Sequence, residues 1–250
     1  MTKVKDIFYE LCRYAPLELQ MGFDNSGFLL GREEAEVSKV LLALDITSSV
    51  VDEAAELGAE LIISHHPLIF SPLKSITDEK LLKLASNNIA VISMHTNLDI
   101  ARGGVNDVLM EAFGASVDAP LDQDDCGRIG TLPKAMRMNE FLVLCKEVLK
   151  TSGLRYYDSG RAVERLAVMG GSGGDSVETA YRLGCDTYLT ADIKYHQFLQ
   201  AAELGINLID GDHFCTENLV IPALADRLAH SFEDLQFIVS SRHRQLINFA

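Results

Sequence analysis

The sequence predicts an α/β fold made of two similar lobes with mainly parallel sheets. Short runs rich in β-branched residues alternate with longer stretches whose apolar residues recur at helical spacing, a pattern typical of βαβ units. The chain has 250 residues, of which 48% are apolar and 23% are charged, enough for one large α/β domain or two small lobes. This composition excludes a wholly disordered chain.

The first half of the chain carries the expected elements in alternating order. It opens with a short amphipathic helix in MTKVKDIFYELCRY. Buried apolar runs predict strands at 40–44, 61–64 and 90–93, and helical spacing predicts helices at 48–57, 78–87 and 103–113. Gly58 and Gly114 are expected to end the first and the last of these helices, because glycine accepts the left-handed backbone found there.

A second series follows a loop that contains Pro120 and the acidic DQDD at 122–125. The same two patterns predict strands at 129–132, 166–169, 187–190, 207–209 and 236–239, and helices at 139–149, 175–183, 195–204 and 213–230. We therefore expect a first lobe at 1–125 and a second lobe at 126–250, packed intimately and without an inserted domain. The last helix and strand can pack back on the first lobe.

One comparison within the chain supports the two lobes. Residues 41–66 and 166–192 share a strand, a turn, a helix ended by Leu-Gly, and a second strand that stops at a polar cluster. This alignment places Asp192 opposite His66 and predicts a site between the strand ends of two facing lobes. Two unrelated βαβ units would look about as similar, so this alternative stays open.

The charge of the chain limits its partners. The 22 Lys and Arg residues against 36 Asp and Glu residues give a formal net charge of -14 and a pI near 4.8. This sign disfavours a nucleic-acid platform. A small anionic substrate stays possible, because a bound divalent metal ion can reverse the local field of an acidic site.

Cysteine usage and the absence of long apolar runs bear on the compartment. The 5 cysteines are widely scattered and form no CxxC pair, so neither a disulfide framework nor a thiolate zinc site is expected. The N-terminus lacks an apolar signal core, and no run reaches the roughly 18 apolar residues that span a bilayer. We expect a soluble, cytoplasmic protein without membrane contacts.

Histidines gather where parallel sheets place their ligands. Four of the 7 histidines lie at or just beyond the carboxyl end of a predicted strand. His65 and His66 precede Pro67, which favours extended backbone, and adjacent extended residues point in opposite directions. Such a pair suits two metal ions better than one. A hydrogen-bonded histidine pair at a sheet edge is the alternative.

Two further clusters supply candidate ligands. His95 and Asp99 lie in SMHTNLD, predicted as one short loop, where turn and capping chemistry would also explain them. His213 and Glu217 lie four residues apart on one helix face, so their side chains can converge, although a glutamate at a helix start can simply complement the helix dipole. Together with His65 and His66, these imidazoles and carboxylates suit Zn, Mn, Fe, Co or Ni.

Four ordered motifs carry a resemblance to a known family: DNSGFLLG at 24–31, ISHHPLIF at 63–70, HTNLDIARGGVND at 95–107 and GDHFCTE at 211–217. Together they resemble the NGG-interacting-factor-3-like family, whose members carry the name type 2 GTP cyclohydrolase I. The resemblance runs from about residue 2 to the C-terminus. It implies a dinuclear metal site between two related α/β lobes and a toroidal homohexamer.

The resemblance also implies which residues bind the two ions. Carried over by motif position, His65 and His213 would bind one divalent ion. His66 and Glu217 would bind the other together with Asp99, and either carboxylate could bridge. Metal-activated water would then attack the carbon between the two nitrogens of the guanine imidazole ring of GTP, and formate would be released.

The catalytic assignment and the substrate have alternatives. His95 is the candidate general acid or base, because it is near the metal motifs, is not needed as a ligand, and imidazole titrates near neutral pH. A hydrolase of another small phosphorylated metabolite is one alternative. A non-enzymatic, ring-shaped metal-binding scaffold or regulatory protein is the other.

Some positions depart from the family pattern or stay undecided. Phe23 stands where the family has Trp, and Asp212 stands where it has Gly, as either a partner of the site or a helix cap. The glycine-rich GGSGGDS at 170–176 could cradle a phosphate or be a plain turn. Lys194 and His196 could meet the substrate or simply face solvent.

Overall fold

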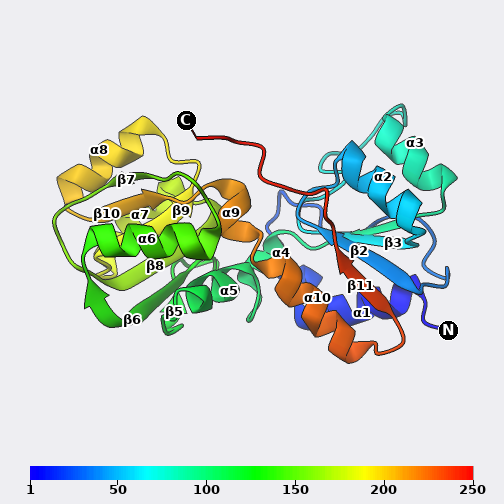
Figure 1. Ribbon diagram of the computed structural model, residues 1–250, viewed down its shortest axis with the longest axis horizontal. Coiled ribbons are helices and arrows are strands. Elements are labelled where there is room, and N and C mark those ends of the chain that lie inside the picture. Colours follow the sequence, from blue (N-terminus) through cyan, green and yellow to red (C-terminus); the bar gives the residue numbers. More distant parts are fainter. Residues whose placement is uncertain (250) are drawn as a thin grey trace. The chain divides into compact units, whose positions relative to one another are not determined.

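The computed structural model describes residues 1–249 and divides the chain into two compact units, each with its own sheet (Figure 1). The first unit comprises Met1–Arg102 and Ile221–Arg244. The second comprises Gly103–Val220 and the residues from Gln245 onward. The chain thus passes from one unit to the other after residue 102, whereas the sequence led us to expect the division after residue 125.

The sheet of the first unit has the strand order β1-β4-β3-β2-β11. Its strands are β1 (Gly27–Leu30), β2 (Lys39–Ala43), β3 (Leu61–Ser64), β4 (Ala90–Ser93) and β11 (Gln236–Val239). Neighbours from β11 to β4 run parallel, and β1 pairs with β4 in the antiparallel sense. The carboxyl ends of β2, β3 and β4 therefore meet at one edge.

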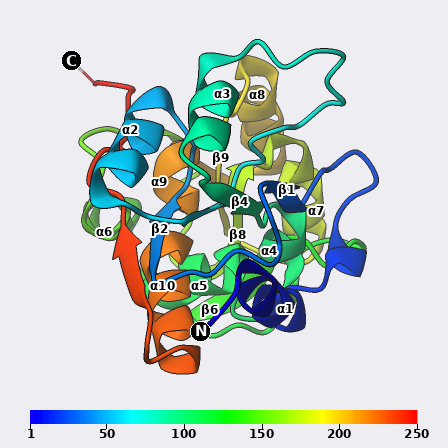
Figure 2. The same cartoon turned by 90° about the vertical axis from the view of Figure 1, so that its right-hand side faces the viewer.

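Helices cover both faces of this sheet. The first unit contains α1 (Val4–Tyr14), the 3-10 turn η1 (Leu17–Leu19), α2 (Ser48–Leu57), α3 (Glu79–Ser86), α4 (Thr96–Ile100) and most of α10 (Val220–Ser231). Figures 1 and 2 show α2 and α3 on one face, and α1 and α10 on the other. Between the sheet and α2, the buried core includes Leu41, Ile62 and Val51.

A capping residue and a glycine set the ends of α2. A buried glutamate on the same helix, Glu53, binds the loop that follows β11. Thr47 caps the helix by accepting the Val50 N–H, and Gly58 ends it with a left-handed φ of 64°. Glu53 accepts hydrogen bonds from Ser240 Oγ and from the Ser241 backbone N–H at 2.9 Å. Burial opposes ionisation, but these hydrogen bonds hold the pKa of Glu53 below its usual value.

Replacing Glu53 by alanine is expected to lower the free energy of unfolding by about 2–3 kcal/mol, because buried donors would lose their acceptor. Since folding lowers the pKa of Glu53, its stabilisation is complete above the unfolded-state pKa and is lost as the pH falls through the folded-state value. Urea unfolding at neutral and at acid pH measures both effects.

Glu56 provides the matched control on the same helix. It is exposed and pairs with Arg242 at the surface, so Glu56→Ala should change the stability by less than about 0.5 kcal/mol. Equal losses in the two variants would contradict the role given to Glu53.

The sheet of the second unit has the order β5-β6-β8-β9-β10-β7. Its strands are β5 (Ala119–Pro120), β6 (Arg128–Met136), β7 (Arg155–Tyr157), β8 (Val163–Ser172), β9 (Thr187–Ala191) and β10 (Asn207–Asp210). The central strands β8, β9 and β10 are parallel, while β5, β6 and β7 pair with their neighbours in the antiparallel sense. The two sheets together confirm the predicted α/β fold.

Helices again lie on both faces of this second sheet. They are α5 (Val105–Ala112), α6 (Met138–Leu149), η2 (Gly174–Ser176), α7 (Val177–Arg182), α8 (Tyr195–Leu204) and α9 (His213–Glu217). Figure 1 shows α5, α6 and α9 on one face, and α7 and α8 on the other. The buried core between α6 and the sheet includes Phe141 on the helix and Leu166 and Ile209 on the strands.

The two units repeat one topology. Each contains three consecutive parallel strands joined by helices, β2-β3-β4 in the first unit and β8-β9-β10 in the second. In each, an antiparallel strand that precedes the three in the sequence, β1 or β7, borders the last of them. Residues 41–66 and 166–192 occupy equivalent places in this repeat, as their similarity predicted.

The prediction of a single helix at 213–230 is wrong, because this segment forms two helices. α9 ends at Glu217 and α10 begins at Val220. Pro222 explains the break: it has no N–H to donate, and its ring would clash with the carbonyl of Asn218, four residues earlier, in a continuous helix. The break separates α9, in the second unit, from the part of α10 that belongs to the first.

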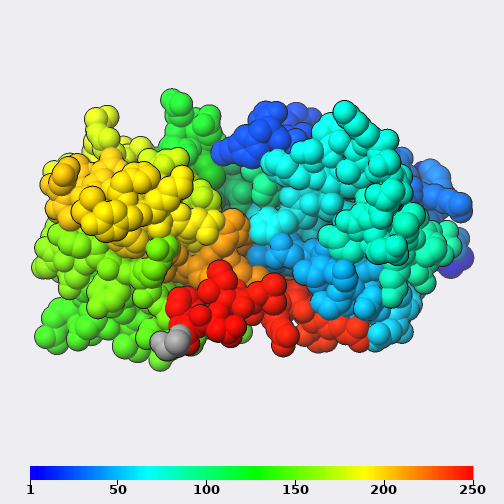
Figure 3. All heavy atoms as spheres, turned by 90° about the horizontal axis from the view of Figure 1, so that it is seen from above, coloured from blue at the N-terminus to red at the C-terminus, as the bar shows by residue number. Residues whose placement is uncertain are grey.

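The C-terminal segment returns to the second unit, and its red atoms lie at the surface in Figure 3. Gln245 donates to the carboxylate of Asp212. The ring of Phe249 lies where a side chain on Gly153 would project, so the two segments are in close contact there. Within residues 1–249, none of the helices has both the length and the apolar character needed to cross a bilayer.

Candidate metal centre

Three histidines gather at the carboxyl edge of the first sheet. His65 and His66 directly follow β3, and His95 follows β4 after one intervening residue. Their candidate ligand nitrogens all lie within 4.8 Å of one another. The ring centroids of His65 and His66 are 5.0 Å apart, and that of His95 lies 5.2 Å from His65. The structure thus brings together the three histidines that the sequence singled out on this unit.

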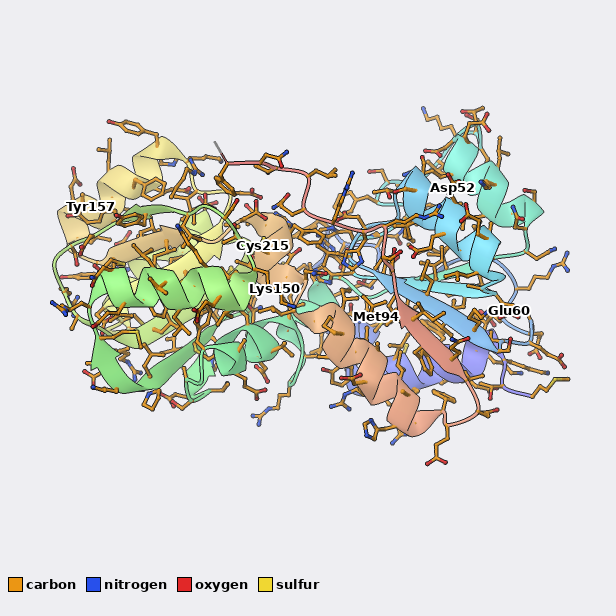
Figure 4. The ribbon with its side chains drawn as sticks, in the orientation of Figure 1. Asp52, Glu60, Met94, Lys150, Tyr157 and Cys215 are labelled. Atoms are coloured by element: carbon orange, nitrogen blue, oxygen red, sulfur yellow. The ribbon has the colours of Figure 1, made fainter. Side chains whose placement is uncertain are left out.

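The ring of His65 is held in a single orientation. Its Nδ1 lies 2.8 Å from the carbonyl oxygen of Met94, which is labelled in Figure 4. A carbonyl oxygen can only accept, so Nδ1 carries the proton, and in the neutral ring Nε2 carries the lone pair that a metal ion binds. Asp99 Oδ1 lies 3.5 Å from this Nε2, so a nitrogen and a carboxylate oxygen converge.

A carboxylate orients His66. Its Nδ1 donates to Asp45 Oδ1 at 2.7 Å. Asp45 follows β2, and the parallel register that pairs Ala43 with Ser64 brings it beside the residues after β3. A carboxylate behind an imidazole fixes the tautomer and makes Nε2 a better metal ligand. Asp45 was not among the site residues predicted from the sequence.

His95 has the same arrangement, built on a buried acid. Its Nδ1 donates to Asp24 Oδ1 at 2.7 Å, and Asp24 Oδ2 accepts from Thr96 Oγ1 at 2.6 Å and Ser26 Oγ at 2.9 Å. Burial alone would raise the pKa of Asp24, but the hydrogen bonds from these three residues hold it well below its usual value. A permanently ionised Asp24 therefore fixes the ring of His95.

Asp99 lies on a short helix rather than in the loop predicted for SMHTNLD. α4 begins at Thr96, directly after His95, and the Leu98 N–H donates to the His95 carbonyl at 2.7 Å. A single helical turn is too short to show the apolar periodicity by which longer helices are recognised. The turn places Asp99 over His65, which explains their contact.

The second unit contributes the other predicted ligand pair. His213 Nε2 and Glu217 Oε2 are 3.2 Å apart on α9, as the four-residue spacing predicted. On the other side of the ring, His213 Nδ1 donates to Asp192 Oδ2 at 2.7 Å. The pKa of His213 is raised to about 9: the hydrogen bond to Glu217 is the main cause, Asp192 contributes, and burial opposes the rise. Two carboxylates thus favour positive charge here.

Strained backbone surrounds this pair. Asp192 and Asp212 have left-handed φ values of 55° and 73°, which are unfavourable for residues with a side chain. Asp212 Oδ1 accepts the Cys215 N–H at 3.1 Å and so caps α9. The undecided role of Asp212 is therefore that of a helix cap, whereas Asp192 is the partner of His213.

A glycine makes room for Glu217. Gly171 has a left-handed φ of 65°, and a side chain added to it would collide with the Glu217 carboxylate. The Gly171 N–H also donates to Thr216 Oγ1 at 3.0 Å, so the turn and α9 are fastened together. The close approach of backbone and carboxylate requires glycine at this position.

Replacing Gly171 by alanine is expected to displace the Glu217 carboxylate and to weaken metal binding by about tenfold or more, as disturbed ligands generally do. Gly184→Ala is the matched control in the same unit: it carries a similar positive φ of 81°, but no atom lies where its Cβ would be. Metal analysis after dialysis measures the effect. Equal metal loss in both variants would attribute it to backbone strain alone.

The other candidates lie around α8 and in the glycine-rich segment. Lys194 is the N-cap residue of α8, where its backbone N–H donates to Gln197 Oε1 at 2.7 Å, and His196 lies exposed in the first turn of that helix. In the glycine-rich segment, the Gly170 N–H donates to Asn106 Oδ1 at 2.9 Å, besides the bond from Gly171 already described. These backbone donors are engaged within the protein, which favours the plain-turn interpretation over a phosphate cradle.

A sequence signal for the orienting carboxylates does exist. Asp45 precedes His66 by 21 residues, and Asp192 precedes His213 by the same 21. In both pairs the aspartate follows one parallel strand and the histidine follows the next, β2 and β3 or β9 and β10. One βαβ crossover therefore separates each aspartate from its histidine.

The donor atoms fit a borderline divalent metal ion. The candidate ligands are imidazole nitrogens and carboxylate oxygens, the set suited to Zn, Mn, Fe, Co or Ni. The nearest thiol in sequence is that of Cys215, on α9 and labelled in Figure 4. Burial raises the pKa of Cys215 to about 11, so its thiol stays protonated at neutral pH and is a poor ligand.

Comparisons with known proteins agree on one family. Residues 2–245 match the family model described as Duf34/NIF3 (NGG1p interacting factor 3). A Clostridium perfringens protein named GTP cyclohydrolase 1 type 2 homolog is 36% identical over 260 residues, which cover 99% of each chain. A Helicobacter pylori protein named GTP cyclohydrolase 1 type 2 is 35% identical over 94% of this chain and 95% of its own.

Solved structures give the same result. Protein SA1388 of Staphylococcus aureus matches with a TM-score of 0.92 at 28% identity, covering 100% of this chain and 99% of its own. Reduced HcgD from Methanocaldococcus jannaschii matches with a TM-score of 0.85 at 30% identity, covering 96% and 98%. Both similarities extend over nearly the whole chain.

Proposed function

Because the chain belongs to the Duf34/NIF3 family, we propose that it is a metal-dependent hydrolase with the GTP cyclohydrolase activity for which its relatives are named. The observation that carries the proposal is the hydrogen bonding of the candidate histidine ligands. His65, His66 and His213 each engage Nδ1 with an oxygen atom, which leaves Nε2 as the metal-binding nitrogen. Contacts of this kind fix the tautomer and the orientation of metal-binding histidines.

The proposed ligands number five and serve two ions per chain. His65 and His213 are assigned to one ion, and His66 and Glu217 to the other, together with Asp99. The resemblance of the motifs to the family supports this division. So does the chemistry, since each ion then receives at least one imidazole nitrogen and each carboxylate can bridge or balance charge.

The metal ions and His95 have different roles in the proposed reaction. Divalent ions held by these ligands would supply the Lewis acidity that polarises a bond for attack by water. His95 acts as the general acid or base: Asp24 holds its Nδ1, so Nε2 is the atom that gives or takes a proton at the substrate. Opening the guanine imidazole ring of GTP by hydrolysis requires such a proton transfer before formate can leave.

The family resemblance also supports a homohexamer, and this part of the proposal has its own measurement. Light scattering should give a mass about six times that of the 27.5 kDa chain. A mass near that of a single chain would contradict it.

The decisive experiment measures formate released from GTP by protein loaded in turn with Zn, Mn, Fe, Co or Ni. We expect formate that depends on the metal and is absent after chelation. Metal analysis of the same samples should give two ions per chain. Two ions without formate would keep the metal centre and reject the reaction. The search would then turn to other phosphorylated metabolites or to a scaffold role.

A further inference from the structure

Two phenylalanines of the first unit are exposed side by side. Phe23 is 63% exposed and Phe70 is 51% exposed, and their ring centroids lie 6.5 Å apart at an interplanar angle of 46°. Each of the two side chains leaves more than half of its surface in water, so the pair offers a place where another apolar or planar group can bind.

Hydrogen bonds hold the two loops that carry these rings. Asn25 Nδ2 donates to the Ile69 carbonyl at 2.6 Å, which ties the loop before β1 to the loop after β3. The Met21 N–H donates to Thr96 Oγ1 at 2.9 Å and fastens the first loop to α4. Figure 2 shows both loops on the same side of the unit. The two loops that carry the rings are therefore held together before any ligand arrives.

The pair borders the proposed acid-base residue. The ring of Phe70 meets that of His95 nearly edge-on, with centroids 6.4 Å apart and an interplanar angle of 79°. Phe23 immediately precedes Asp24, whose carboxylate holds His95. A flat group resting on the phenylalanines would thus lie next to the imidazole that gives or takes the proton.

We propose that Phe23 and Phe70 form a stacking platform that binds the planar heteroaromatic ring of the substrate and presents it to His95. The inference rests on the proposed function for the identity of that ring as guanine and for the role of His95. With the rings at 46°, a base can stack on one face and meet the edge of the other. Sugar and phosphate groups have no π-face and gain little here.

The sequence contains no Trp, so one introduced tryptophan reports on the platform alone. Phe23→Trp keeps a stacking face and adds fluorescence. GTP and guanosine should quench it in a saturable manner, and inorganic triphosphate should not. Phe70→Leu, which stays apolar but loses the π-face, should raise the Kd for guanosine about 5- to 100-fold.

Phe232→Trp is the matched control. Phe232 pairs with Phe237 at almost the same geometry, 6.4 Å and 44°, but Phe237 lies beside Val40 at the amino end of β2, opposite the histidine edge. Its fluorescence should show no saturable quenching. Equal saturation in the two tryptophan variants, or an equal response to inorganic triphosphate, would overturn the platform.

The outcomes separate this inference from the proposed reaction. Saturable guanosine binding that Phe70→Leu weakens, with no formate from any metal-loaded sample, would keep the platform and reject the cyclohydrolase activity. Formate release with an unchanged KM for GTP in both Phe23→Leu and Phe70→Leu would keep the activity and reject the platform. A change of oligomeric mass with unchanged Kd would make the patch a contact between copies and also reject it.

Discussion

Replacing His66 by alanine is expected to leave the folded protein with fewer than two bound ions per chain. The substitution removes a proposed ligand whose ring is already oriented by Asp45, and losing even such an orienting partner typically costs 10- to 100-fold in metal affinity. Losing the ligand itself should therefore weaken the binding of one ion by about 100-fold or more. Metal analysis after dialysis, with circular dichroism to confirm folding, measures the result.

Two further variants sharpen this test. Asp45→Asn keeps the ring of His66 but removes the charge behind it, so we expect a smaller, roughly tenfold loss of affinity. His230→Ala removes an exposed histidine on α10 whose Nδ1 contacts the Asp226 carbonyl, and it should retain every ion. Full occupancy in His66→Ala would contradict the ligand assignment, whatever the other variants show.

The elements that carry the site could be predicted because their signals are local. β3, β4, α2 and α8 have the expected bounds or lie within a residue of them, since buried strands are continuous apolar runs and helices end at glycine. The positions of His65, His66 and His95 beyond their strands follow directly. The predicted pairing of His213 with Glu217 needed only the helical repeat.

Other features depend on pairing that a sequence does not display. β1 and β7 are short antiparallel edge strands: β1 is apolar but too short to show a periodicity, and β7 is largely exposed. Asp24 reaches His95 across 71 residues because β1 pairs with β4, a contact that no local rule predicts. The break before α10 could have been predicted, since Pro222 cannot lie in the interior of a helix that begins at His213.

Replacing His95 by alanine is expected to lower formate release from GTP by about 10²- to 10⁴-fold, the usual contribution of a positioned acid or base. The expected loss is in kcat, because the proposed ligands of both ions remain in place. His196→Ala, which removes an exposed histidine at the start of α8, should leave kcat unchanged. Turnover and metal content are measured on the same preparations.

Metal content decides between two roles that the geometry allows for His95. Its candidate ligand nitrogen lies within 4.8 Å of those of His65 and His66, so it could bind an ion instead of moving a proton. As an acid or base, its loss lowers kcat and leaves two ions per chain. As a ligand, its loss lowers turnover and metal content together, as in His66→Ala. A loss of both turnover and metal content would therefore show that His95 is a metal ligand and that another residue transfers the proton.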